Sequence, residues 1–190
     1  MKQVLVHACC GPCLIYPFEQ LKRNGFLPSA YWYNPNIFPE KEYQKRKESL
    51  LSYCHNHEIT VCESENESRQ EYYKWLFSGL LNAKNRCYIC WEQRLLKTAI
   101  AAKQLKFSAF TTTLLVSTYQ DIDAIMRIGK AIADRENIEF LAIDFRAGFD
   151  YAHCKAEEEG LYKQRWCGCI YSFNDRFNAM SKRHRPKARK

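Results

Sequence analysis

Short apolar runs alternate along this chain with longer segments of helical periodicity. The runs lie at residues 4–7, 30–33, 59–62, 108–111 and 139–143, are rich in β-branched or aromatic residues, and mostly lack a polar face. Strands that are buried on both sides of a sheet have this composition. Between the runs, apolar residues recur at helical spacing, most regularly in residues 122–133, where they form one continuous face.

This alternation predicts an α/β fold: a single Rossmann-like domain with a mainly parallel sheet of about five strands and helices on both faces. We expect the domain to span residues 1–180 and a basic, disordered tail to follow at 181–190. Pro12 suits the first turn of the first helix, but Pro17 lacks an N–H, so that helix is expected to start late or to bend. In such sheets, ligands bind beyond the carboxyl ends of the strands.

Composition and charge refine this picture. The chain has 190 residues, of which 46% are hydrophobic, which suits one packed domain and excludes a disordered protein. The formal net charge is +8, but six of the 29 basic residues stand among the last ten, and the remaining 23 nearly balance the 21 acidic residues. The basic end is either a solvated tail or a salt-sensitive contact to phosphates.

The ten cysteines raise the question of compartment. The apolar stretch at the N-terminus is too short for the hydrophobic region of a secretory signal. No apolar run approaches the roughly 18 residues that a membrane helix needs. We therefore expect a cytoplasmic protein, in which cysteines serve as metal ligands, redox groups or small core residues rather than as structural bridges.

Two cysteine motifs have the spacing of a metal site. Cys9 and Cys10 follow the first strand, with Cys13 close behind, and Cys87 and Cys90 form a CxxC at the start of a helical segment. A helix start turns both CxxC sulfurs to one face and favours thiolates. Four thiolates fit either tetrahedral zinc or an iron–sulfur cluster. A CC pair joined to a distant CxxC is not the usual pair of zinc knuckles, which favours the cluster. A thioredoxin-like CxxC would follow a strand and is disfavoured.

A third motif, Cys167-Gly168-Cys169, has a different logic. Two cysteines separated by one residue close a disulfide only in a small strained ring. Such a bond is easily reduced, so it suits a redox role better than a structural one. The alternative is two unpaired thiols in a loop. The three cysteines that stand alone fit small buried or half-buried core residues; they are Cys54, Cys62 and Cys154.

The motifs of the chain, taken in order, resemble one known family, the cobalamin-independent epoxyqueuosine reductases of the QueH type. The likeness covers roughly residues 4–173 and rests on the following motifs: Cys9-Cys10-Gly11-Pro12, Tyr33-Asn34-Pro35-Asn36-Ile37 with Glu42, Tyr43 and Arg46, Arg86-Cys87-Tyr88-Ile89-Cys90 with Arg94 and Leu95, Thr112-Thr113-Leu114-Leu115-Val116-Ser117, Asp144-Phe145-Arg146, and residues 162–172 around the Cys167-Gly168-Cys169 motif.

The resemblance implies an enzyme that reduces the epoxide of epoxyqueuosine, at the wobble position of tRNA, to the alkene of queuosine with loss of water. It implies a [4Fe-4S] cluster whose matching ligands are Cys9, Cys10, Cys87 and Cys90, and a redox-active disulfide between Cys167 and Cys169. It also implies an additional iron next to the cluster. Many members carry an aspartate at the position of Cys13, so the resemblance leaves the ligands of that iron open.

The implied partners are a tRNA, through its anticodon loop carrying epoxyqueuosine, and an unidentified electron donor. Five arginines lie in or beside the motifs and are candidates either for contact with the nucleotide or for a surface or ion-pairing role: Arg46, Arg86, Arg94, Arg146 and Arg165. Two other interpretations stay open. One is a zinc-stabilised α/β domain that binds RNA without catalysis, and the other is a thiol–disulfide oxidoreductase that acts on proteins.

Overall fold

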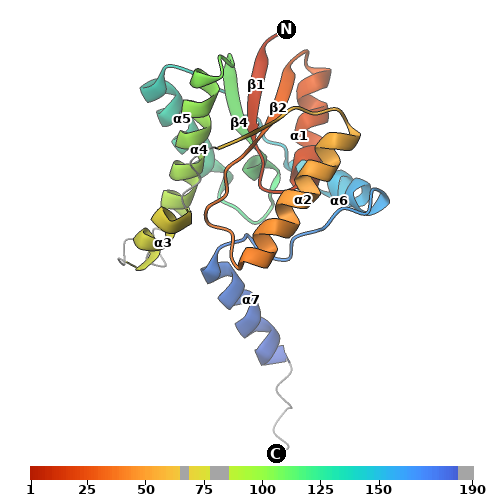
Figure 1. Cartoon of the computed structure of the whole chain (residues 1–190), viewed down its shortest axis with the longest axis vertical. Helices are drawn as coiled ribbons and strands as arrows, with labels where there is room; N and C mark the ends of the chain where they lie inside the picture. The colour runs from red at the N-terminus through yellow and green to blue at the C-terminus, as the bar shows by residue number, and fades with distance from the viewer. Residues whose placement is uncertain (65–68, 78–85, 184–190) are drawn as a thin grey trace, which may run out of the picture.

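The computed structural model describes residues 1–64, 69–77 and 86–183. In this part of the chain five strands form one sheet in the order β3-β2-β1-β4-β5, and every neighbouring pair is parallel. The strands are β1 (Gln3–His7), β2 (Leu27–Trp32), β3 (Val61–Glu63), β4 (Ala109–Thr112) and β5 (Glu139–Phe140). All five predicted strands and the α/β class are thus confirmed (Figure 1).

Helices cover both faces of this sheet. Helix α1 contacts α2 and α6, whereas α4 packs against α5 (Figure 1). The helices are α1 (Gly11–Arg23), α2 (Glu40–Asn56), α3 (Arg69–Phe77), α4 (Arg86–Gln104), α5 (Ile122–Glu136), α6 (Phe149–Glu158) and α7 (Ile170–Arg183), with short 3-10 helices η1 (Thr113–Val116) and η2 (Arg146–Gly148). None of the helices described is both long and apolar enough to cross a membrane.

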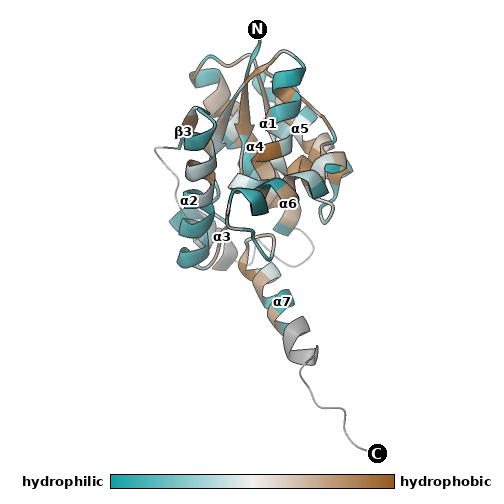
Figure 2. Ribbon diagram, turned by 90° about the vertical axis from the view of Figure 1, so that its right-hand side faces the viewer, coloured by the Kyte–Doolittle hydropathy of each residue, from teal (hydrophilic) through white to brown (hydrophobic). Residues whose placement is uncertain are grey.

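Helix α7 differs from the others because it runs away from the sheet (Figures 1 and 2). It continues through Arg183, and the rest of the predicted basic tail, residues 184–190, lies outside the described residues. The outer turns of α2 and α6 are hydrophilic, whereas the strands carry the hydrophobic residues (Figure 2). The core therefore lies between the sheet and its two helical layers.

The central strand β1 determines which edge of the sheet the cysteine motif after it occupies. Val4, Leu5 and Val6 are fully buried, because β2 and β4 flank the strand and helices cover both faces. His7 is in register with Tyr31 of β2 on one side and with Thr112 of β4 on the other. The segments that follow β1, β2 and β4 therefore leave the same carboxyl edge of the sheet, where ligands bind in folds of this class.

Helix α1 begins directly at this edge. It starts at Gly11, immediately after Cys10, and Pro17 lies inside it, so the expectation of a late start is wrong. Pro12 stands in the first turn, as predicted. Pro17 removes one intrahelical hydrogen bond, and the apolar face around Leu14, which is fully buried, holds the helix on the sheet despite this loss.

Gly11 allows α1 to approach α2 closely, and its replacement gives a first testable prediction. A Cβ atom at this position would lie 2.5 Å from the backbone carbonyl oxygen of Ser49 in α2. We expect Gly11→Ala to lower the free energy of unfolding by about 1–3 kcal/mol through this overpacking, measured by urea denaturation. An exposed helical Gly→Ala change normally stabilises by about 0.5–1 kcal/mol, and a gain of that kind would contradict the close approach.

Candidate active site

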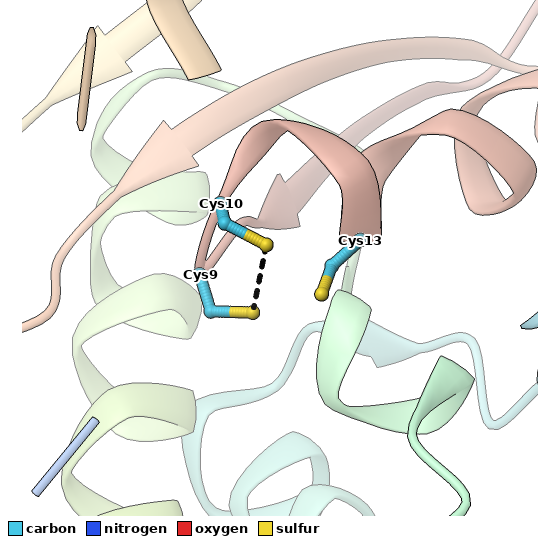
Figure 3. A group of neighbouring side chains, drawn as sticks. All are labelled: Cys9, Cys10 and Cys13. Atoms are coloured by element: carbon cyan, nitrogen blue, oxygen red, sulfur yellow. Dashed lines mark hydrogen bonds between the residues drawn. The ribbon is translucent and has the colours of Figure 1, made fainter. Parts of the chain in front are cut away.

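Three cysteines meet where β1 leads into α1 (Figure 3). The Sγ atoms of Cys9, Cys10 and Cys13 all lie within 4.8 Å of one another, and those of Cys9 and Cys10 are 4.0 Å apart. Cys10 is the N-cap residue of α1, and Cys13 lies in its first turn. Cys9 and Cys10 thus face one centre, as their place after the strand suggested, and the structure adds Cys13 to them.

The three thiols influence one another's protonation. Hydrogen bonds from Cys10 and Cys13 lower the pKa of Cys9 well below its usual value, and the hydroxyl of Thr113, 3.5 Å from its Sγ, acts in the same direction. Burial raises the pKa of Cys10, whereas hydrogen bonding with its two neighbours raises that of Cys13. The group therefore favours a single thiolate, on Cys9, which the two other thiols stabilise.

His7 supports this loop without joining the sulfur group. It is fully buried, and its Nε2 donates to the backbone carbonyl of Tyr33 at 3.2 Å. Its Nδ1 then accepts from the hydroxyl of Thr112 at 2.9 Å. Burial, with the positive charge of Arg94 as the next cause, lowers the pKa of His7 to about 3. His7 is therefore a neutral core histidine with both ring nitrogens satisfied.

The CxxC motif lies at the start of α4, as the sequence predicts. Cys87 is exposed and Cys90 is buried, and neither belongs to the group of three sulfurs. Arg94 lies one turn after Cys90, and its positive charge interacts with Cys90 of the CxxC motif and with Cys9 of the CC motif. Burial raises the pKa of Cys90, and the charge of Arg94 opposes this rise.

The third motif lies in the loop between α6 and α7, where Cys167 and Cys169 are separate thiols. Gly168 has a φ of 125°, a conformation that favours glycine. The amide of Gln120 donates to the Sγ of Cys167 at 3.8 Å. The Sγ of Cys169 accepts from the backbone N–H of Ser172 at 3.4 Å, at the start of α7. Both sulfurs therefore have a hydrogen-bond donor in place.

A buried arginine of α2 holds this loop. Arg46 is fully buried; its Nη1 donates to the carbonyl of Cys167 at 3.1 Å and its Nη2 to that of Trp166 at 2.9 Å. Its Nε donates to Glu42 at 2.7 Å, and the other oxygen of Glu42 accepts from the hydroxyl of Tyr162 at 2.6 Å. Of the two roles that the sequence left open for Arg46, the structure thus shows the ion-pairing one.

Replacing Arg46 gives a second prediction. Arg46→Met would leave the Glu42 carboxylate buried without its cation, so we expect a loss of about 3–5 kcal/mol in the free energy of unfolding, measured by urea denaturation. The matched control is Arg23→Met, which breaks an exposed Arg–Glu pair of the same spacing with Glu19. That change is expected to cost about 0.5 kcal/mol or less. Losses of equal size in the two variants would contradict the role of Arg46.

The isolated cysteines do not all follow expectation. Cys54 is buried and Cys62 is half-buried, as small core residues are expected to be. Cys154 is exposed, so the expectation is wrong for this residue, because it lies on α6 away from the buried positions Ala152 and Ala156.

An open hollow of about 850 Å³ lies at the opposite edge of the sheet, where Ser108 and Glu139 line it, and none of the cysteines lines it.

Fold and site together define a parallel α/β protein of the Rossmann-like type with a group of three thiols at the carboxyl edge of its sheet. The family model described as "Epoxyqueuosine reductase QueH" matches residues 4–175. The chain therefore belongs to the QueH family of epoxyqueuosine reductases, which confirms the resemblance seen in its motifs.

Individual relatives agree with this assignment. The epoxyqueuosine reductase QueH of Dehalococcoides mccartyi is 31% identical over 175 residues, which cover 92% of this chain and 94% of the relative. That of Thermotoga maritima is 32% identical over 183 residues, covering 93% of each chain. A solved structure described as a "predicted subunit of tRNA methyltransferase" from Methanocaldococcus jannaschii has a TM-score of 0.55 at 15% identity and covers 83% of this chain and 75% of its own. That likeness concerns the fold alone.

Proposed function

We propose that this chain reduces the epoxide of epoxyqueuosine at the wobble position of tRNA to the alkene of queuosine, with loss of water. Membership of the QueH family supports the substrate and the reaction. The observation that carries the chemistry is the grouping of Cys9, Cys10 and Cys13 within 4.8 Å, beside a buried arginine whose charge also acts on Cys90 and Cys167.

We propose further that a [4Fe-4S] cluster is held by Cys9, Cys10, Cys87 and Cys90. An all-sulfur donor set suits iron–sulfur clusters and zinc rather than harder metals. An anionic cluster also fits the surroundings, because the buried Nε and Nη2 of Arg94 have no hydrogen-bond partner within the part of the chain that the structure describes. When bound, the cluster would supply electrons one at a time at the carboxyl edge of the sheet. We assign Cys13 to the additional iron, because its sulfur lies in the same group as those of Cys9 and Cys10.

The Cys167–Cys169 pair is proposed as the store of reducing equivalents. Removal of the epoxide oxygen as water takes two electrons and two protons. Oxidation of two thiols to a disulfide releases two electrons and two protons, so the two half-reactions balance. Gln120 and the backbone N–H of Ser172 would orient the two sulfurs through the contacts described above, and Arg46 would keep their loop in place.

One experiment tests this function against its rivals. The protein is purified anaerobically, its absorbance spectrum is recorded, and iron, sulfide and zinc are counted. It is then incubated with a reductant and tRNA that carries epoxyqueuosine, and the nucleosides are analysed by mass. We expect visible absorbance, acid-labile sulfide, and conversion to a nucleoside that lacks one oxygen atom. An iron content above that of one cluster is expected if Cys13 holds the additional iron.

The rival functions predict different outcomes. A zinc-stabilised RNA-binding domain would be colourless, would contain zinc without sulfide, and would leave the nucleoside unchanged. A thiol–disulfide oxidoreductase would reduce protein disulfides with no metal present. Either result, in place of conversion of the nucleoside, would overturn the proposed function.

A further inference from the structure

We propose that Arg94 is the buried counter-cation of the thiolate centre and that it raises the reduction potential of the cluster bound there. The inference rests on the proposed function, because it assumes the cluster. It assigns to Arg94 a role as a positioning residue that acts through the sulfur ligands, without contact to the substrate.

The first argument is the burial of this charge. Arg94 is 1% exposed, and a guanidinium stays charged at any ordinary pH. Its Nη1 lies 3.5 Å from Oδ1 of Asn34, at the limit of a hydrogen bond, and its Nε and Nη2 have no hydrogen-bond partner among the described residues. A buried cation is strongly unfavourable unless negative charge compensates it, so the site suits thiolates or an anionic cluster beside Arg94.

The second argument is the identity of its neighbours. The groups whose negative charge acts most strongly on Arg94 are Cys90, Cys167 and Cys9, in that order. The charge of one cation thus interacts with a cysteine from each of the three motifs, and no carboxylate stands among these groups. Arg46 is the contrasting case, because Glu42 neutralises it at 2.7 Å. The charge of Arg94 therefore remains available to the sulfurs.

The third argument concerns what reduction does to charge. A cluster with four thiolate ligands is an anion, and it gains one further negative charge when it is reduced. A fixed cation in a buried site stabilises the more negative state, because the surrounding dielectric screens the interaction poorly. His7 cannot take this part, since it is neutral beside the same loop. Arg94 is thus expected to make the cluster easier to reduce.

The test compares midpoint potentials of the cluster, measured by spectroelectrochemistry on anaerobically prepared full-length protein. Arg94→Met removes the charge at similar length, Arg94→Gln keeps an N–H donor without the charge, and Arg94→Lys keeps the charge. The control is Lys103→Met, which removes an exposed positive charge from the same helix. Circular dichroism checks the fold of each variant.

We expect Met and Gln at position 94 to lower the equilibrium constant for cluster reduction by about tenfold or more, which is about 59 mV per tenfold for a one-electron couple. Arg94→Lys and Lys103→Met are expected to stay within about threefold of the unchanged chain. Folded Met and Gln variants that take up no cluster, while the Lys variant does, would support the counter-cation equally.

Other outcomes overturn the inference. An unchanged midpoint potential in Arg94→Met, with or without a raised KM for tRNA, would show that the charge of Arg94 does not influence the cluster. Equal loss in the Lys, Gln and Met variants would assign the effect to the shape of the guanidinium. Failure of the unchanged chain to bind a cluster would instead defeat the proposed function, so the two failures are distinguishable.

Discussion

Replacing Cys87 with alanine is expected to remove the visible absorbance of the cluster and the reduction of epoxyqueuosine together. Alanine offers no thiolate, and the three other proposed ligands would leave one iron of the proposed cluster without its protein sulfur. Because Cys87 is exposed at the start of α4, its truncation should change the free energy of unfolding by about 0.5 kcal/mol or less. Loss of function would therefore come from the metal centre and not from unfolding.

The matched control for this variant is Cys154→Ala. Cys154 is also an exposed helical cysteine, but it lies on α6, outside the three motifs. Iron, sulfide and nucleoside product are counted in both variants after the same anaerobic preparation, with urea denaturation as a check on folding. Cys154→Ala should behave as the unchanged chain does. A Cys87→Ala protein that keeps its sulfide content and its activity would remove Cys87 from the ligand set.

The pattern of apolar residues was sufficient to predict the framework of this molecule. Runs without a polar face indicated strands buried on both sides, and the helical segments between them required parallel pairing. The rule that ligands gather at the carboxyl ends of such strands then led to the segment after His7, where three cysteines do meet. Exact strand lengths did not follow, because β5 stops at Phe140 rather than at residue 143.

The pattern of apolar residues did not predict which polar groups of the site are buried. Arginines are rarely fully buried, and the sequence left Arg46 and Arg94 open between contact with the nucleotide and a surface or ion-pairing role, although both are buried. The i, i+4 spacing of Glu42 and Arg46 was a signal for an ion pair, but not for its burial. For Cys13, spacing could not tell whether the first turn of α1 would aim the sulfur at Cys9.

The two buried arginines, Arg46 and Arg94, differ in the groups that their charges contact. Arg46 is neutralised by Glu42, and its remaining N–H groups bind the backbone carbonyls of the loop that holds Cys167. Its effect is on position. No carboxylate of the described residues pairs with Arg94, and its charge acts on cysteines, so on the inference above its effect would be on the reduction potential. We infer that a buried ion pair suits a loop that must stay still, and a buried single cation suits a centre that gains electrons.

Replacing Cys167 with serine is expected to leave the cluster in place but to abolish repeated turnover. Serine is close in size to cysteine and can still accept from the amide of Gln120, so the loop should keep its conformation. It cannot form a disulfide, so the pair can no longer deliver two electrons and two protons. With tRNA in excess over enzyme, we expect at least a roughly tenfold fall in product per chain, with absorbance and iron content unchanged.

Two comparisons give this prediction its force. Cys169→Ser should show the same loss of repeated turnover, because a disulfide needs both sulfurs. Cys154→Ser should turn over normally. A pre-reduced Cys167→Ser enzyme, given less tRNA than enzyme, should form little product, since the one electron that the proposed cluster would hold is short of the two that the epoxide needs. Normal repeated turnover in Cys167→Ser would exclude the dithiol from the reaction, and the external donor would then have to reduce the cluster directly.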